Sequence, residues 1–288
     1  MDGIIIIDKP LGYTSRDIVN IVSKKINSKK VGHTGTLDPN ASGVMILCVG
    51  KALKMCELLM NHYKEYEATV ILGISSDTLD LDSNATIIED TYVELNDNDI
   101  IEAVNSFKGK YLQAVPMYSS VKVNGKKLYE YARNNISVTV PKKEVDIEDI
   151  KVVGDILHID GKIEFTIKTT VSRGTYIRSL VRDIGNKLEV PAVTKKLKRL
   201  KLGSFSIDMA NSLEDIKNGS FTLYKITDIF NNIPIIKVDD AIAFKIKNGV
   251  SIENLSKFQL TFIVDKNDNL LALYKKVDNV NRPYKMFV

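Results

Sequence analysis

The chain of 288 residues contains no tryptophan and only two cysteines, Cys48 and Cys56. Two cysteines cannot form the disulfide framework of a small secreted protein, and their spacing matches no zinc or redox motif. We therefore expect both to be buried free thiols in a reducing cytosol.

Long apolar runs are also missing. The longest run near the amino terminus is Ile4 to Ile7, which is flanked by Asp2 and Asp8 and has no basic segment before it. We expect no signal peptide, and no run approaches the roughly 20 apolar residues of a membrane span. These absences favour a cytoplasmic protein without membrane contact.

The composition that remains is that of a globular protein, with 44% hydrophobic and 26% charged residues. The net charge of +4 conceals an asymmetry, because residues 77–102 hold nine acidic and no basic side chains. The rest of the chain has 40 basic against 27 acidic side chains, a net charge of +13. A polyanionic partner is consistent with this excess.

Hydrophobic patterning predicts an alternation of strands and helices in one large domain, with a boundary near residue 232. Expected strands are residues 3–8, 44–49, 66–72 and 165–171. Expected helices are residues 15–26, 52–60, 97–108 and 176–188. After the boundary, residues 258–264 and 270–277 flank a Lys-Asn-Asp-Asn turn and predict a hairpin. Residues 31–42, rich in glycine and small polar side chains, are expected to be a loop.

One carboxylate in this loop stands out. Asp38 lies near the end of the segment Gly-His-Thr-Gly-Thr-Leu-Asp-Pro over residues 32–39, where glycines permit close approach of a ligand and Pro39 favours an extended Asp38. An isolated Asp-Pro is usually a surface turn. The histidine, threonines and glycines between two buried strands favour a site instead, although neither a phosphate-loop nor a dinucleotide motif is present.

A second candidate lies where a strand passes into a helix, in Ser-Arg-Gly-Thr-Tyr-Ile-Arg over residues 172–178. Arg178 falls in the first helical turn beside the inward-facing Ile177, and an arginine near a buried face needs a carboxylate partner. The alternative is a surface arginine that pairs with Asp183 or faces solvent.

Basic residues gather in two further segments. Residues 121–143 interleave lysines and an arginine with Tyr129 and Tyr131, and residues 195–201 hold five basic side chains among seven. Basic and aromatic side chains together suit contact with RNA. A solvated face is the alternative for either segment alone.

The sequence has no convincing metal or cofactor motif. Asp80, Asp82 and Asn84 imitate the start of a calcium loop, but Ala85 and Thr91 occupy its glycine and glutamate positions. His62 and His158 have no partners at metal-binding spacing. We therefore expect no metal and no cofactor.

Several blocks together resemble the TruB family of tRNA pseudouridine synthases. They are the Gly-Ile-Ile-Ile-Ile-Asp-Lys-Pro-Leu-Gly of residues 3–12, the Asp38 loop, and the segments 64–66, 76–80, 116–120, 125–133 and 174–178. The blocks run in family order over most of residues 1–205, and the last 55 or so residues match more weakly.

The resemblance implies an isomerase that converts uridine 55 in the T loop of tRNA to pseudouridine, with the base flipped out of its stack. It makes Asp38 the nucleophile, lets Tyr66 pack on the base, and pairs Arg178 with Asp38. It places four further residues at the substrate or the strand end beside it: His33, Tyr176, Leu200 and Lys9. The residues do not decide between attack at C1′, attack at C6 and a glycal route.

The fold implied is an α+β pseudouridine-synthase fold, a mixed and largely antiparallel sheet with flanking helices. Residues 1–232 would form the catalytic domain, with an RNA-gripping insertion at about 121–146, and residues 233–288 a small PUA-like RNA-binding β domain. The expected partner is the T stem-loop of tRNA, bound by a monomer.

Two alternatives stay open. A related group that works inside a guide-RNA particle shares the Asp38 block, but the compact chain without basic tails favours a stand-alone enzyme. A non-catalytic RNA chaperone is the other alternative, and the presence of Asp38, Tyr66 and Arg178 argues against it.

Overall fold

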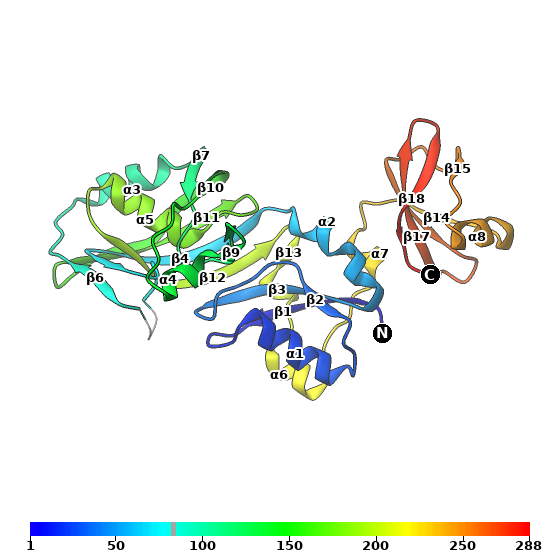
Figure 1. The fold of residues 1–288 in the computed structure, drawn as a ribbon, viewed down its shortest axis with the longest axis horizontal. Coiled ribbons are helices and arrows are strands. Elements are labelled where there is room, and N and C mark those ends of the chain that lie inside the picture. Colours follow the sequence, from blue (N-terminus) through cyan, green and yellow to red (C-terminus); the bar gives the residue numbers. More distant parts are fainter. Residues whose placement is uncertain (82–84) are drawn as a thin grey trace.

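The computed structural model describes residues 1–81 and 85–288. A nine-stranded sheet fills the left and centre of Figure 1, and a smaller five-stranded sheet lies at its right. The main path of the large sheet runs β1-β3-β12-β4-β11-β10-β7, with β2 beside β3 and β13 beside β12. Its strands are β1 (Gly3–Lys9), β2 (Val31–His33), β3 (Ala41–Val49), β4 (Lys64–Leu72), β7 (Gly109–Ala114), β10 (Lys142–Ile159), β11 (Lys162–Val171), β12 (Ala192–Leu202) and β13 (Phe205–Ser206).

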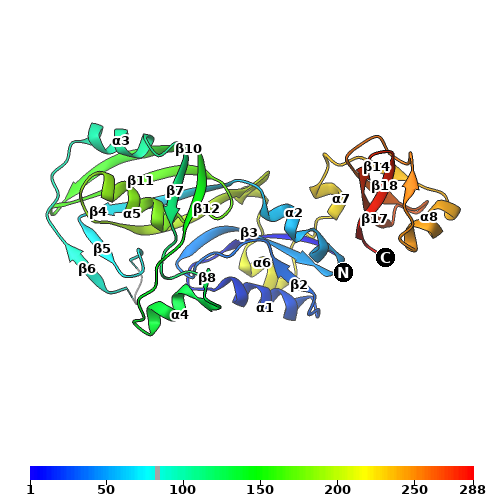
Figure 2. The same cartoon turned by 45° about the horizontal axis from the view of Figure 1, so that its top comes forward.

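Helices and short strands pack around this sheet. The remaining elements before residue 230 are α1 (Ser15–Lys25), η1 (Gly50–Met55), α2 (Cys56–Met60), β5 (Ile74–Ser76), β6 (Ile87–Asp90), α3 (Asp97–Asn105), β8 (Lys122–Val123), β9 (Lys126–Lys127), α4 (Leu128–Arg133), α5 (Ile177–Lys187), η2 (Ile207–Met209), α6 (Leu213–Asn218) and α7 (Ile226–Ile229). Figure 2 shows α1 and α6 side by side beneath β1 and β3.

The continuous apolar run of β1 is explained by burial on both faces. Ile5 and Ile7 belong to a core shared with α1, α3, α5 and α6, whereas Ile4 and Ile6 belong to a second core on the other face. A strand that is covered on both sides needs apolar residues at every position. Its antiparallel register with β3 pairs Ile5 with Leu47.

The strand that completes the sheet comes late in the sequence. β12 lies between β3 and β4, parallel to β3 and antiparallel to β4. Gly43 makes the close approach of β3 possible, because its φ is +106° and a Cβ there would lie 2.1 Å from the carbonyl oxygen of Arg199. Two irregularities in the β12 register, between Thr194 and Lys196 and between Arg199 and Lys201, bend the strand at this junction.

The second core joins the large sheet to the carboxy-terminal region. Phe230, Phe262 and Phe287 pack in the cluster that contains Ile4 and Ile6. The carboxy-terminal elements are β14 (Ile235–Lys237), α8 (Asp240–Lys247), β15 (Ile252–Glu253), β16 (Leu260–Val264), β17 (Leu270–Val277) and β18 (Val280–Met286), with sheet order β14-β16-β17-β18-β15. This small sheet fits the expected PUA-like domain, and the boundary near residue 232 stays a prediction.

The predicted α+β class and largely antiparallel sheet are confirmed, and so are the expected strands, the α1 and α5 helices and the β16–β17 hairpin. The loop expected over 31–42 is wrong at both ends, because Val31–His33 forms β2 against β3 and β3 itself begins at Ala41. The glycines there did not prevent pairing, since Gly32 sits opposite Cys48 in the ladder.

The predicted insertion is only partly outside the sheet. Residues 122–133 form β8, β9 and α4; β8 and β9 pair with each other in a sheet of their own, and Figure 2 shows α4 below the large sheet. Residues 142–146 instead begin β10 and pair with β7. No helix among the described residues is long and apolar enough to cross a membrane.

Candidate active site

The loop that carries Asp38 is fixed at each end and in its middle. The Thr34 amide donates to Ile46 O at 3.1 Å, and the Ala41 amide donates to Asp38 O at 3.0 Å. Ser15 Oγ accepts from the Leu37 amide at 2.8 Å and donates to Leu37 O at 3.0 Å. These bonds hold the loop while leaving the Asp38 side chain 43% exposed.

Arg178 meets this carboxylate. Its Nη2 lies 2.8 Å from Asp38 Oδ2, and the arginine side chain is 8% exposed. Nη1 donates to Thr78 O at 2.7 Å and Nη2 to Tyr118 O at 3.1 Å. The guanidinium is therefore oriented from three segments, which fixes the Asp38 carboxylate in turn.

The alternative pairing of Arg178 with Asp183 is not what the structure shows. Asp183 Oδ1 instead accepts from Arg182 Nε at 3.0 Å and Nη2 at 2.7 Å. Arg178 is on the first turn of α5 and turns toward the Asp38 loop, whereas Arg182 points back to Ala114 O.

A second arginine, which the sequence shows only as part of a basic run, lies under the site. Arg199 is 1% exposed and donates to Val44 O at 2.6 Å and to Gly35 O at 3.3 Å. Its Nη1 lies 3.5 Å from the Tyr66 hydroxyl, and Tyr66 is opposite Arg199 in the β4–β12 register. Arg199 thus connects β3, the Asp38 loop and Tyr66.

Two buried lysines lie beside the same loop. Lys9 is fully buried and its Nζ donates to three carbonyls, of Pro10 at 2.9 Å, Tyr13 at 2.7 Å and Pro39 at 3.4 Å. Burial lowers the pKa of Lys9 to about 8, against the opposing attraction of Asp38. These bonds make Lys9 a support for the Asp38 loop, because they use all three donors of its ammonium group.

Lys64, at the start of β4, is also buried and donates to His62 O at 3.1 Å. Burial and the nearby positive charges of Arg199, Arg173 and Lys143 lower the pKa of Lys64 to about 8. The region under the loop is therefore rich in cations that are held by backbone carbonyls.

Tyr176 and His33 also lie near the loop. Tyr176 immediately precedes α5, and burial raises the pKa of its hydroxyl, with Asp38 adding to the effect. Burial, with Arg16 and Arg199, lowers the pKa of His33. His33 Nδ1 is buried and has no hydrogen-bond partner within residues 1–81 and 85–288.

Leu200 is the extra residue at the second β12 irregularity, between Arg199 and Lys201, and it is half-buried. Its role as a wall of the base pocket stays a prediction. Leu197, on the same strand, is buried and lines a cavity of about 410 Å³ beside Asn40 and Leu11. The sequence could indicate Leu197 only through alternation, since Leu197 and Arg199 are two residues apart on one strand.

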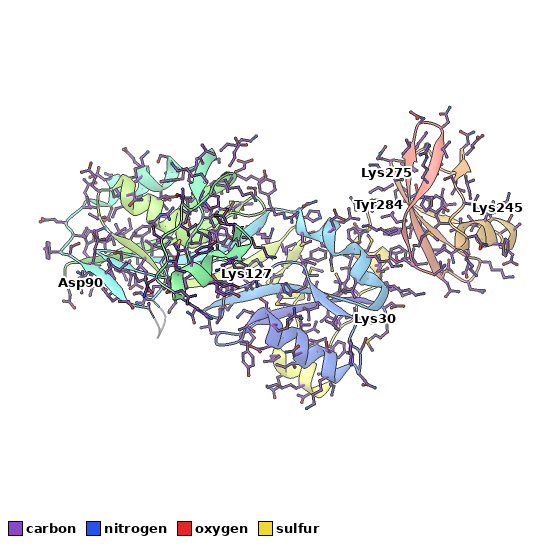
Figure 3. All side chains as sticks on the ribbon, viewed as in Figure 1. Lys30, Asp90, Lys127, Lys245, Lys275 and Tyr284 are labelled. Carbon is purple, nitrogen blue, oxygen red and sulfur yellow. The ribbon has the colours of Figure 1, made fainter. Side chains whose placement is uncertain are left out.

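The basic segments have different surroundings. On β12, Lys195 pairs with Glu164 at 2.7 Å and Lys201 with Glu65 at 3.6 Å, and Lys196 and Lys198 form no ion pair with any described residue. On the insertion, Lys127 and Arg133 each lie 5.3 Å from the ring centre of Tyr129. Figure 3 shows Lys127 on the insertion, far from Lys245, Lys275 and Tyr284 of the carboxy-terminal region.

Within the described residues no group of three or more acidic, histidine or cysteine side chains could hold a metal ion. Asp82 and Asn84 of the calcium-like pattern lie outside the described residues.

Known proteins resemble this chain over most of its length. A family model described as TruB family pseudouridylate synthase (N terminal domain) matches residues 23–177. The chain is 39% identical over 286 residues to tRNA pseudouridine synthase B of Staphylococcus aureus (strain MRSA252), covering 95% of this chain and 94% of that protein. It is 39% identical over 264 residues to tRNA pseudouridine synthase B of Bacillus subtilis (strain 168), covering 90% of this chain and 85% of that protein.

Solved structures extend the likeness to the whole fold. A chain from an H/ACA RNP bound to a substrate RNA containing 2′-deoxyuridine superposes with a TM-score of 0.69 at 22% identity, covering 99% of this chain and 85% of that chain. A chain from a Cbf5-Nop10-Gar1 complex has the same TM-score and coverage at 23% identity. At this identity the match concerns the fold alone. The family model and the curated relatives go further: the chain belongs to the TruB family of pseudouridine synthases.

Proposed function

We propose that this pseudouridine synthase isomerises uridine 55 in the T loop of tRNA, as a stand-alone enzyme with Asp38 as its nucleophile. The observation that carries the proposal is the Arg178–Asp38 ion pair of 2.8 Å on a loop fixed by Ser15 and Lys9. A carboxylate that is half-exposed yet held by a buried, oriented guanidinium suits covalent attack on a nucleotide.

The surrounding residues take supporting roles in the proposal. Tyr66, held at its hydroxyl by Arg199, and Tyr176 provide aromatic surfaces for a flipped base. Leu200 is the residue that the resemblance assigns to the apolar wall of the base pocket. His33 meets the RNA through the accessible part of its half-buried ring, and Lys9 supports the loop.

The proposed partner is tRNA, bound by the insertion and the small β domain through phosphate contacts. The tRNA specificity is supported by the names of relatives that match nearly the full chain. The cytoplasmic location, the monomeric state and the independence from guide RNA stay predictions.

The test is purified protein with an unmodified tRNA transcript and no guide RNA, scored for pseudouridine at single-nucleotide resolution. We expect product at position 55 only, and none when that uridine is replaced by cytidine. Asp38→Asn should abolish product while changing the Kd for tRNA by less than about tenfold, because phosphate contacts supply most of the affinity.

A matched control is Asp155→Asn, which removes an exposed carboxylate from β10. It should keep wild-type turnover. Retained turnover in Asp38→Asn would exclude the nucleophile assignment, and product that appears only with an added guide RNA would exclude the stand-alone enzyme.

A further inference from the structure

Gln113 is a buried polar residue on an edge strand, and the proposed chemistry does not use it. It lies on β7, where alternate residues face opposite ways, so Tyr111 and Gln113 share the face toward α5. Gln113 is 1% exposed, whereas its neighbour Leu112 is 66% exposed. A polar side chain is thus buried while an apolar neighbour is left in solvent, which calls for a reason beyond burial of apolar surface.

The Gln113 carboxamide binds both backbone groups of a single residue. Its Oε1 accepts from the Tyr176 amide at 2.8 Å, and its Nε2 donates to Tyr176 O at 3.1 Å. Nε2 also donates to the Tyr111 hydroxyl at 2.6 Å. Both donors of the amide group and its carbonyl oxygen are therefore used.

Tyr176 is the residue at which α5 begins. It has extended backbone angles and makes no side-chain capping bond, while its carbonyl accepts from the Leu180 amide at 3.0 Å. Gln113 therefore supplies, from another strand, an acceptor for the amide of the helix-cap residue, the bond that an N3 side chain makes in a capping box. Arg178 follows two residues later, in the first turn of the same helix.

A network behind Gln113 keeps it in place. The Tyr111 hydroxyl donates to Asp183 Oδ2 at 3.3 Å, Arg182 holds Asp183, and Arg182 Nη2 returns to Ala114 O at 3.3 Å. These hydrogen bonds connect β7 to α5 through Tyr111 before Gln113 and through Ala114 after it. Burial raises the pKa of the Tyr111 hydroxyl, with Asp183 adding to the effect.

We propose that Gln113 is a positioning residue, whose hydrogen bonds to both backbone groups of Tyr176 set the first turn of α5 and so aim Arg178 at Asp38. This inference rests on the proposed function. Gln113 acts on turnover through Tyr176 and Arg178, and its own carboxamide is committed to Tyr176 and Tyr111.

The test compares Gln113→Leu and Gln113→Glu with a control that removes the same kind of contact elsewhere. Asn281 in the small β sheet is fully buried, and its carboxamide also binds both backbone groups of one residue, Ser256, at 3.0 and 3.3 Å. Asn281→Leu therefore removes a buried carboxamide clamp far from Asp38.

In single-turnover reactions at saturating tRNA, Gln113→Leu should slow pseudouridine formation by roughly 10- to 100-fold, the scale of a displacement of about 1 Å. The Kd for tRNA should stay within about twofold. Gln113→Glu keeps an acceptor for the Tyr176 amide but sets a buried carboxylate oxygen against the Tyr176 carbonyl, so its rate should also fall below that of wild type. Asn281→Leu should keep the wild-type rate.

Hydrogen–deuterium exchange gives a readout that does not depend on activity. Peptides covering residues 172–180 should exchange faster in Gln113→Leu than in wild type, because this variant frees the Tyr176 amide. In Asn281→Leu the same peptides should exchange at the wild-type rate. Absence of pseudouridine with wild-type protein would refute the proposed function and leave this exchange test in force. Wild-type exchange and rate in a folded Gln113→Leu protein, or an equal loss of rate in Asn281→Leu, would overturn the positioning role.

Discussion

The buried cations beneath the Asp38 loop and the surface lysines of β12 (Lys195, Lys196, Lys198 and Lys201) carry the same charge but have different surroundings. Lys9 and Arg199 are buried, and they donate to the backbone carbonyls of Pro39 in the loop and of Val44 in the strand after it. Lys195 and Lys201 lie at the surface, each with one glutamate. A buried cation with fixed acceptors orders the chain, whereas a surface lysine keeps its mobility and is screened by salt. Sequence charge alone therefore cannot separate a site-building cation from an RNA-binding one.

The largest loss of turnover is expected when Arg178, the buried cation that contacts Asp38, is replaced. Arg178→Lys should lower turnover by roughly 10²-fold, because a lysine cannot reproduce the planar fork that joins Asp38, Thr78 and Tyr118. Arg178→Ala should be worse, since the carboxylate then loses the cation that orients it. The Kd for tRNA should change little in both variants, and single-turnover rates with binding titrations measure the two effects.

Lys187→Arg is the control, because Lys187 is exposed at the carboxy-terminal end of the same helix, α5. A collapse of binding in Arg178→Lys, with the rate restored at saturating RNA, would mean that Arg178 holds a phosphate instead of Asp38.

A smaller effect is expected from the buried Lys9. Its pKa is about 8 in the folded chain, against the ordinary 10.5. Below pH 8 both states carry the proton and the burial penalty is complete; between about pH 8 and 10.5 the folded chain loses the proton first, so the penalty is relieved. The free energy of unfolding of wild type relative to Lys9→Met should thus rise with pH in this window, by at most about 1.4 kcal/mol per pH unit.

Urea unfolding at pH 7, 8, 9 and 10 measures this difference. Lys30→Met, which changes an exposed lysine that Figure 3 labels, should give a difference that does not vary with pH. A flat difference for Lys9→Met as well would show that the folded chain binds the Lys9 proton as tightly as the unfolded chain.

The smallest effect is expected from replacing the surface lysines of β12. Lys196→Ala with Lys198→Ala should reduce the slope of log K against log salt for tRNA by up to about 0.7–0.9 for each phosphate that the variant no longer neutralises. Lys195→Ala with Lys201→Ala should reduce it less, because these two side chains are already paired with glutamates. Equal slopes in wild type and the first double variant would assign the whole segment to a solvated face.

The sequence predicted best where one local pattern decides the structure. The apolar run of β1 and the stripe of α5 predicted their elements, and the motif resemblance indicated the Asp38–Arg178 pair. It predicted poorly where partners are distant. Arg199 sits in a run of lysines, and its burial depends on β12 lying between β3 and β4, which no local pattern reveals.

Two further residues were missed for the same reason. The sequence did not indicate that Leu197 lines a cavity. Which residues of β12 face inward depends on the two register irregularities, and residue alternation does not predict them. Gln113 carried none either, since a glutamine on an amphipathic edge strand looks like an ordinary exposed residue until α5 is placed against it.

The central place of β12 also sets the order in which a newly made chain can become an enzyme. β3 and β4 are synthesised within the first quarter of the chain, yet the strand that joins them, with Arg199 on it, emerges after about two-thirds of synthesis. Until then both flanking strands present open edges on the ribosome, and the Asp38 loop lacks the strand that supports it. The surroundings of the proposed nucleophile are therefore completed late in synthesis. A chain released before residue 202 contains Asp38 but lacks part of the strand that supports its loop.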